Sequence, residues 1–239
     1  DRTFIADSFS CRVGKGTHRA LNRLRSFAYR ASHNHTRTIW ILKCDIKKCF
    51  ASINHEILLN MLAAYIPDKN IMWLLEHVVG SFLSVAPGVG LPLGNLTSQL
   101  FVNIYLNVLD QWVKHELHVK YYLRYADDFV FCSEDRAWLV SLILRIRLFL
   151  NDELNLTLHP RKIELCTFAS GVDFLGWVHF PDHRVLRTST QHRMFRRIEE
   201  SDKQFEVVES YFGLMGHGNS RLLVDAIEQW RYEGKLRYK

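Results

Sequence analysis

The stretch VKYYLRYADDFVFCS, residues 119–133, decides the predicted fold. Aromatic and β-branched residues predominate in 119–125 and 129–133, and only Ala126, Asp127 and Asp128 separate these two segments. So short a connection predicts an antiparallel hairpin with acidic residues at its tip. A third apolar segment, TIWILKCDI at 38–46, predicts a strand whose end carries Asp45.

The rest of the chain alternates between helical and extended patterns around a Gly/Pro-rich loop at 86–95. Helices are predicted over 54–65, 68–84, 96–118, 135–150, 190–211 and 221–230, with extended pieces at 156–158, 162–166, 172–180 and 184–187. This order is the split βαβ pattern, an α+β fold whose antiparallel sheet carries helices on one face. We expect a basic helical lead-in at 1–37, the sheet domain at 38–188, and C-terminal helices at 189–239.

Composition excludes several classes of protein. The 239 residues are 48% hydrophobic and include 31 Lys+Arg against 25 Asp+Glu, a net charge of +6, which excludes a disordered chain. The five cysteines form no CxxC pair, which argues against a zinc site or a disulfide framework and for a reducing compartment. The most apolar stretch, 139–150, is short and contains two arginines, so we expect a cytoplasmic protein without a membrane span.

Positive charge gathers at the start of the chain, where residues 1–44 hold nine basic and two acidic side chains. Arg19 and Arg23, with Arg30, fall at spacings of four and seven on one face of a predicted helix. Such a stripe suits a nucleic-acid backbone. The alternative is a solvated helix face, which is the preferred interpretation of a stripe taken alone.

The acidic residues carry the chemistry. Asp45, Asp127 and Asp128 each interrupt apolar β sequence, where an unpaired buried charge is costly. In a split βαβ sheet the first strand adjoins the central hairpin, so the carboxylates could meet at one edge and bind Mg²⁺. Taken singly, turn chemistry explains Asp127-Asp128 and a strand-end cap explains Asp45.

Four ordered motifs between about residues 40 and 180 carry a family resemblance. Tyr125-Ala126-Asp127-Asp128 resembles the YxDD box of reverse transcriptases, and DIKKCF at 45–50 resembles the first catalytic motif of that family. LPLGNLTSQ at 91–99 is similar to the loop and helix that hold the templating base pair, and FLGW at 174–177 is similar to the primer-grip hairpin.

The resemblance implies a polymerase palm with a partial helical thumb and with the fingers, expected before Asp1, largely missing. It implies two Mg²⁺ ions, which Mn²⁺ could replace, held by Asp45, the Ile46 carbonyl, Asp127 and Asp128. It further implies an RNA template, a DNA or RNA primer and deoxynucleoside triphosphates as partners. The residues implied at the nucleotide are Lys48, Cys49, Phe50, Leu93, Gly94 and Lys162, and those at primer or template are Arg19, Arg23, Tyr125, Phe174, Leu175, Gly176 and Trp177.

Some of these residues have plain alternatives. Phe50 and Trp177 could be core aromatics, and Lys162 could be an exposed strand lysine. The LGNLTSQ form of the loop resembles diversity-generating retroelements and related bacterial enzymes, which implies error-prone copying and a small basic accessory protein. A catalytically idle palm that binds nucleic acid or a partner, and an antiphage-defence or group II intron-like reverse transcriptase, remain alternatives.

Overall fold

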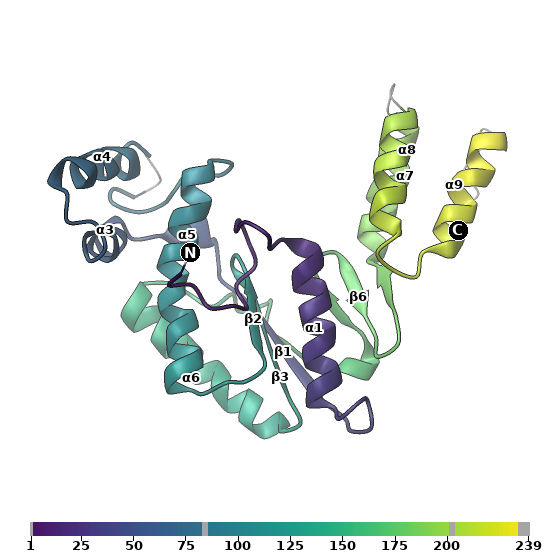
Figure 1. Cartoon of the computed structure of the whole chain (residues 1–239), viewed down its shortest axis with the longest axis horizontal. Helices are drawn as coiled ribbons and strands as arrows, with labels where there is room; N and C mark the ends of the chain where they lie inside the picture. Colours follow the sequence, from purple (N-terminus) through teal and green to yellow (C-terminus); the bar gives the residue numbers. More distant parts are fainter. Residues whose placement is uncertain (1, 83–85, 201–203, 234–239) are drawn as a thin grey trace. The chain divides into compact units, whose positions relative to one another are not determined.

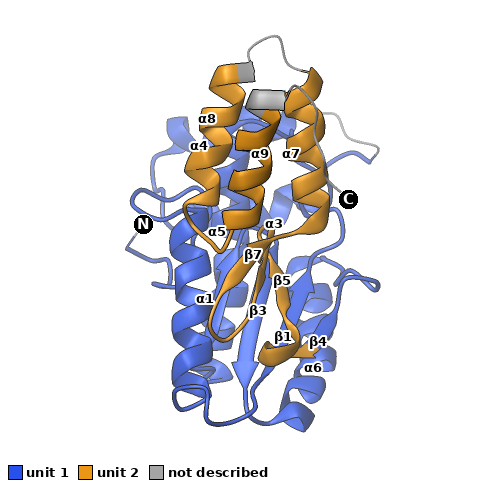
Figure 2. Ribbon diagram, turned by 90° about the vertical axis from the view of Figure 1, so that its right-hand side faces the viewer, with its two compact units in different colours: residues 1–165 blue, residues 166–239 orange. Residues whose placement is uncertain are grey.

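The computed structural model describes residues 2–82, 86–200 and 204–233. The chain divides into two compact units, residues 1–165 and residues 166–239, which Figure 2 shows in different colours.

Unit 1 is built around a four-stranded sheet with the spatial order β2-β3-β1-β4. β1 pairs antiparallel with β3, and β2 pairs antiparallel with β3. The first strand therefore adjoins the central hairpin, as the split βαβ pattern predicts, and the α+β fold is confirmed. The strands are β1 (Trp40–Asp45), β2 (Tyr122–Tyr125), β3 (Asp128–Ser133) and β4 (Glu164–Thr167), the last of which reaches across the boundary between the units.

Helices connect these strands, and their starts follow capping chemistry. The side chains of Asn54, Asp68 and Asp135 each accept a hydrogen bond from a backbone N–H in the first turn of the helix that follows. The helices of unit 1 are α1 (Thr17–Ala31), α2 (Cys49–Ser52), α3 (His55–Ala63), α4 (Lys69–Gly80), α5 (Leu96–Gln111), the π-helical turn Trp112–Glu116 and α6 (Arg136–Leu154).

Helices cover both faces of the sheet in unit 1. The main core joins Leu42 and Phe131 of the sheet to the buried faces of α5 and α6. α1 contacts β2 and β3 and lies on the other side of the sheet from α5 and α6, as Figure 1 shows. The prediction of helices on one face describes α5 and α6 but not α1. Neighbouring residues Ile41 and Leu42 are both fully buried, and a strand that is apolar on both faces needs cover on both.

Unit 2 contains a three-stranded antiparallel sheet of order β5-β6-β7. The single extended segment predicted over 172–180 is two strands, because Leu175 and Gly176 form a turn between them. The predicted helix 190–211 is described as two helices, with residues 201–203 outside the described part. The elements are the 3₁₀ turn Phe168–Ser170, β5 (Val172–Phe174), β6 (Trp177–His179), β7 (Arg184–Leu186), α7 (Thr188–Glu200), α8 (Gln204–Met215) and α9 (Arg221–Glu233).

Two further features follow from the structure. All five cysteines are free thiols. Within residues 2–82, 86–200 and 204–233, no helix has both the length and the apolarity to cross a bilayer.

Candidate active site

The three predicted carboxylates belong to one edge of the unit 1 sheet. Asp45, the last residue of β1, lies directly opposite Asp128, the first residue of β3. Tyr125 pairs with Asp128 across the β2–β3 hairpin, so Ala126 and Asp127 form its two-residue loop. Residues directly opposite in an antiparallel pair have Cα atoms about 4.5–5.5 Å apart. The strand pairing therefore brings residues separated by about eighty positions in the chain to one edge.

The negative charges of these three carboxylates repel one another. Burial raises the pKa of Asp127, and the neighbouring Asp45 raises it further. Burial also raises the pKa of Asp128 to about 6, with Asp127 and Asp45 contributing in the same direction. A cluster of carboxylates that resist ionisation together is stabilised by a cation placed among them.

One cation at this edge comes from the chain itself. Lys162 Nζ donates a hydrogen bond to Asp45 Oδ2 at 2.8 Å, and this bond raises the pKa of the lysine. The Lys162 side chain is 56% exposed, whereas that of Asp45 is 9% exposed. Lys162 therefore reaches from solvent to the buried carboxylate, and the predicted basic residue lies beside the predicted catalytic acids.

The donor set fits Mg²⁺ in chemistry and in charge, since carboxylate oxygens are its preferred protein ligands. Among the described residues, no three acidic, histidine or cysteine side chains stand arranged around a single metal position. Asp45, Asp127 and Asp128 stay the predicted ligands, and Lys162 Nζ forms a hydrogen bond to Asp45 Oδ2.

The three predicted nucleotide-binding residues after Asp45, which are Lys48, Cys49 and Phe50, differ in their exposure to solvent. Lys48 is exposed, has a left-handed φ of 48°, and precedes α2. Cys49 is buried, and burial raises its thiol pKa, so its side chain belongs to the core. Phe50 packs against the core while remaining half-buried. The chain therefore offers Lys48 and part of Phe50 to a ligand, and from Cys49 only the backbone.

The loop before α5 is tied to this segment. Leu91 N–H donates to Phe50 O at 2.7 Å, and the buried His55 side chain hydrogen-bonds Gly90 O at 2.7 Å. Leu93 is 81% exposed, and Gly94 has a φ of +89°. The loop is thus anchored at its base and presents Leu93 to solvent. The contact of His55 was not predictable, because a histidine at a helix start carries no signal of a distant carbonyl partner.

The predicted basic stripe on α1 is divided by its contacts. Arg19 is exposed, whereas Arg23 Nε donates to Asp7 Oδ1 at 2.7 Å and its guanidinium lies over the Phe27 ring. Arg19 is therefore the better placed of the two for a phosphate. α1 also reaches the YADD segment, since the hydroxyls of Thr17 and Tyr125 lie 3.1 Å apart in a hydrogen bond.

The predicted primer-grip residues belong to unit 2. Phe174 and Trp177 pair across the β5–β6 hairpin and are each 1% exposed, so both are core aromatics of this unit. Leu175 and Gly176 form the turn, with φ angles of 49° and 86°.

The structure adds an unpredicted pair beneath the YADD turn. Arg124 and Asp110 are both fully buried and form an ion pair at 2.7 Å. Each is a charge within an apolar pattern, one in β2 and one on the buried face of α5. That anomaly is the signal that could have identified them.

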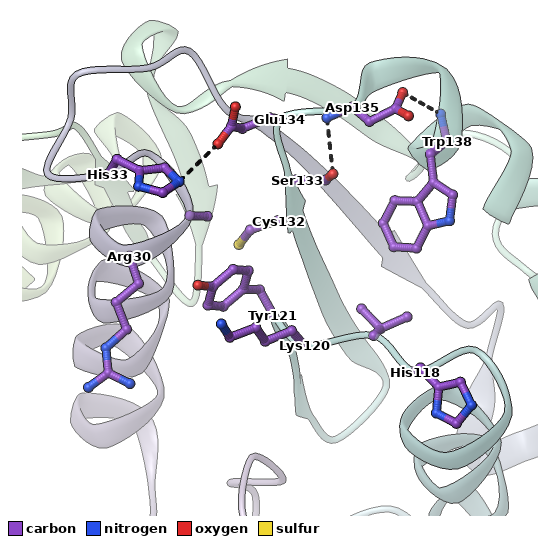
Figure 3. A pocket seen from close by; sticks show the side chains of 12 residues that line it. Arg30, His33, His118, Lys120, Tyr121, Cys132, Ser133, Glu134, Asp135 and Trp138 are labelled. Carbon is purple, nitrogen blue, oxygen red and sulfur yellow. Dashed lines mark hydrogen bonds and ion pairs between the residues drawn. The ribbon is translucent and has the colours of Figure 1, made fainter.

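A separate cavity of about 430 Å³ lies at the other end of β3 (Figure 3). Its walls include Arg30 and Lys120, which are balanced by Glu134 and Asp135. Glu134 contacts His33, while Asp135 caps α6. None of the three candidate catalytic acids lines this cavity.

A split βαβ sheet with carboxylates at the edge where its first strand meets the central hairpin has the architecture of a polymerase palm. The sequence match makes the class specific: the chain belongs to the reverse transcriptase (RNA-dependent DNA polymerase) family, whose model matches residues 2–179.

Relatives and solved structures agree with this assignment. The chain is 26% identical over 204 residues to protein YkfC of Escherichia coli (strain K12), covering 67% of the chain and 50% of YkfC. It is 24% identical over 228 residues to the group II intron-encoded protein LtrA of Lactococcus lactis subsp. cremoris, covering 64% of the chain and 36% of LtrA.

Apo telomerase from Candida tropicalis shares the fold, with a TM-score of 0.62 and 14% identity over 84% of this chain and 41% of that one. This chain spans half or less of the length of the curated relatives it matches.

Proposed function

We propose that this chain extends the 3′ end of a DNA or RNA primer with deoxynucleotides, copying an RNA template. The observation that carries the proposal is the pairing of Asp45 with Asp128 across β1 and β3, with Asp127 in the adjoining loop. Membership of the family supports the reaction class.

Asp45, Asp127 and Asp128 would hold two divalent ions, Mg²⁺ or Mn²⁺. When bound, such ions favour deprotonation of the attacking hydroxyl and neutralise charge on the phosphates. Lys162, already beside Asp45, would turn toward the departing pyrophosphate and neutralise it. Most of the gain in rate would come from positioning and charge neutralisation.

The remaining predicted residues would contact and position the substrates. Phe50 would contact the sugar of the incoming nucleotide, with Lys48 and the Cys49 backbone beside it. Leu93 and Gly94 would line the pocket that holds the new base pair. Tyr125, Arg19 and Arg23 would contact primer or template, and so would the unit 2 turn formed by Leu175 and Gly176 between Phe174 and Trp177.

The decisive experiment replaces one acid by its amide. Asp127→Asn is expected to lower primer extension on an RNA template by at least about a hundredfold, because it removes charge from the ion site. Asp152→Asn, on the exposed surface of α6, is the matched control and should extend normally. Extension by Asp127→Asn at the wild-type rate would contradict the proposal.

A second candidate is a catalytically idle palm that binds nucleic acid or a partner protein. The contact of Lys162 with Asp45 Oδ2 favours it, because the lysine already supplies a positive charge at that oxygen. Duplex binding without incorporation, in Mg²⁺ and in Mn²⁺, would support the idle palm.

We further propose that this chain belongs to the branch of reverse transcriptases found in diversity-generating retroelements. It would act in the cytoplasm with a small basic accessory protein. The sequence LGNLTSQ at 93–99 supports this branch, because Leu93 cannot make the hydrogen bonds of a glutamine beside the base pair. Similarity to LtrA favours a group II intron-like enzyme as the alternative, and antiphage defence is another. Sequencing of extension products separates them: errors concentrated at template adenines support the first branch.

A further inference from the structure

Every donor of the Arg124 side chain has a partner. A guanidinium carries five N–H groups. Nε and Nη2 donate to the two carboxylate oxygens of Asp110, at 2.8 and 2.7 Å. Nη1 donates to Asn103 Oδ1 at 3.2 Å and to Ala126 O at 2.9 Å, and Nη2 also donates to Ser8 Oγ at 3.3 Å. The side chain is fully buried, so these partners replace all of its contact with water.

One of these bonds reaches the loop that carries the catalytic aspartate. Ala126 has a φ of 52°, a left-handed conformation that is unfavourable for a residue with a Cβ atom. Asp127 follows it directly, so the orientation of the Asp127 carboxylate depends on the peptide between the two residues. The bond from Arg124 Nη1 to Ala126 O fixes the carbonyl of that peptide.

The other end of the network rests on α5. Asp110 and Asn103 are seven residues apart and share one buried face of this helix. Asp110 also accepts a hydrogen bond from the Tyr122 hydroxyl at 2.7 Å, and Asn103 donates to Ser10 O at 2.8 Å. Arg124 therefore joins the loop to a packed helix that contains none of the three acids.

We propose that Arg124, held by Asp110, is a positioning residue that keeps Ala126 left-handed and thereby sets Asp127 for divalent-cation binding. The inference rests on the proposed function of the three carboxylates. A lysine at position 124 would keep the charge, but its single nitrogen cannot pair with both Asp110 oxygens and also reach Ala126 O as the planar fork does.

The test compares two variants of the full chain. Arg124→Lys alters the donor to the loop, whereas Tyr122→Phe removes a different hydrogen bond to Asp110 and leaves the Ala126 contact in place. Mn²⁺ binding without nucleic acid is measured by electron paramagnetic resonance of the unbound ion. Hydrogen–deuterium exchange of residues 125–129 and thermal unfolding are measured on the same samples.

Arg124→Lys is expected to weaken Mn²⁺ binding by about 10–100-fold, the usual effect of losing a group that orients a metal ligand, and to speed exchange in the loop. Tyr122→Phe should unfold at a lower temperature while keeping the wild-type Mn²⁺ affinity and loop exchange. A third variant, Asn103→Ala, replaces Arg124→Lys in the test if Arg124→Lys does not fold. It removes one acceptor of Arg124 Nη1 and should weaken Mn²⁺ binding and speed loop exchange to a smaller extent.

Wild-type Mn²⁺ affinity and loop exchange in Arg124→Lys would overturn the proposal. So would a loss of Mn²⁺ affinity in Tyr122→Phe equal to that in Arg124→Lys, because the network would then act only through stability. If the wild type itself binds no Mn²⁺, the proposed function fails, and the exchange rates of the loop still decide whether Arg124 positions it.

Discussion

Two hairpins in this chain turn within two residues, but they are stabilised in different ways. Leu175 and Gly176, between β5 and β6, have φ angles of 49° and 86°, and glycine adopts the second without cost. In the β2–β3 loop the left-handed residue is Ala126, with a φ of 52°, and no glycine is present. Each turn therefore holds one left-handed residue with a Cβ atom, Leu175 or Ala126, but only the first turn places a glycine beside it.

An arginine–aspartate pair adjoins each turn. Arg187 Nε donates to Asp173 Oδ1 at 2.8 Å, with side chains 39% and 33% exposed, and Arg187 N–H donates to Gly176 O at 3.0 Å. The pair of Arg124 with Asp110 is fully buried. Water screens the first pair and not the second, so the buried pair has far more influence on the geometry of its turn.

The largest difference between the hairpins should appear when each arginine is truncated. Arg124→Met leaves the buried Asp110 without its cationic partner, and is expected to lower the free energy of unfolding by about 3–5 kcal/mol. Arg187→Met should lower it by about 1 kcal/mol or less, because its partner stays hydrated. Urea denaturation of the full chain measures both. Equal losses would show that burial does not distinguish the two pairs.

A smaller difference is expected from exchanging glycine and alanine in the turns. Gly176→Ala should lower the free energy of unfolding by about 1–2 kcal/mol through left-handed strain alone. A Cβ there would meet Thr190 Oγ1 at 3.7 Å, an ordinary contact. Ala126→Gly should change stability by less than about 1 kcal/mol, since relief of strain is offset by the flexibility of glycine. Thermal unfolding would contradict this view if Ala126→Gly were the more damaging change.

A further effect is expected from pH, and it concerns the hairpin that contains Asp128. Folding raises the pKa of Asp128 from 3.8 to about 6, chiefly through burial. Between these values the folded state binds more protons than the unfolded state, so the free energy of unfolding falls as pH rises from 4 to 6. Lys43 and Lys162 reduce the effect.

Thermal unfolding in EDTA measures this pH dependence. Asp128→Asn should remove that part of the slope. In samples without EDTA, Mn²⁺ should stabilise the wild type more at pH 7 than at pH 5. A wild-type slope identical to that of Asp128→Asn would contradict the assignment.

The sequence predicts the elements that depend on local chemistry. Asn54 and Asp68 cap helices where expected, and the short spacing around Ala126 produces the hairpin. Asp45 meets Asp128 because strand order follows from the alternation of elements. Local signals fail where a boundary depends on packing, as with β2, which begins at Tyr122 rather than at 119.

The sequence predicts which acids lie at the candidate site, but it does not predict the buried contacts that hold their hairpin in place. Nothing in the sequence near Arg124 indicates that its partner is Asp110, fourteen residues earlier on a helix. Likewise, the segment DIKKCF does not reveal that the Cys49 side chain turns into the core while Lys48 turns out. Such contacts depend on how elements pack, which periodicity does not encode.

The position of α5 in the chain constrains how the protein can change in length. The helix starts two residues after Gly94 and runs for 16 residues, about 24 Å, with Asp110 in its last turn. Inserting or deleting a single residue between Leu96 and Asp110 would rotate the carboxylate by about 100° away from the hairpin. Length variation in this region is therefore expected to be confined to the loop before Leu96, which can lengthen without changing the helical phase of Asp110.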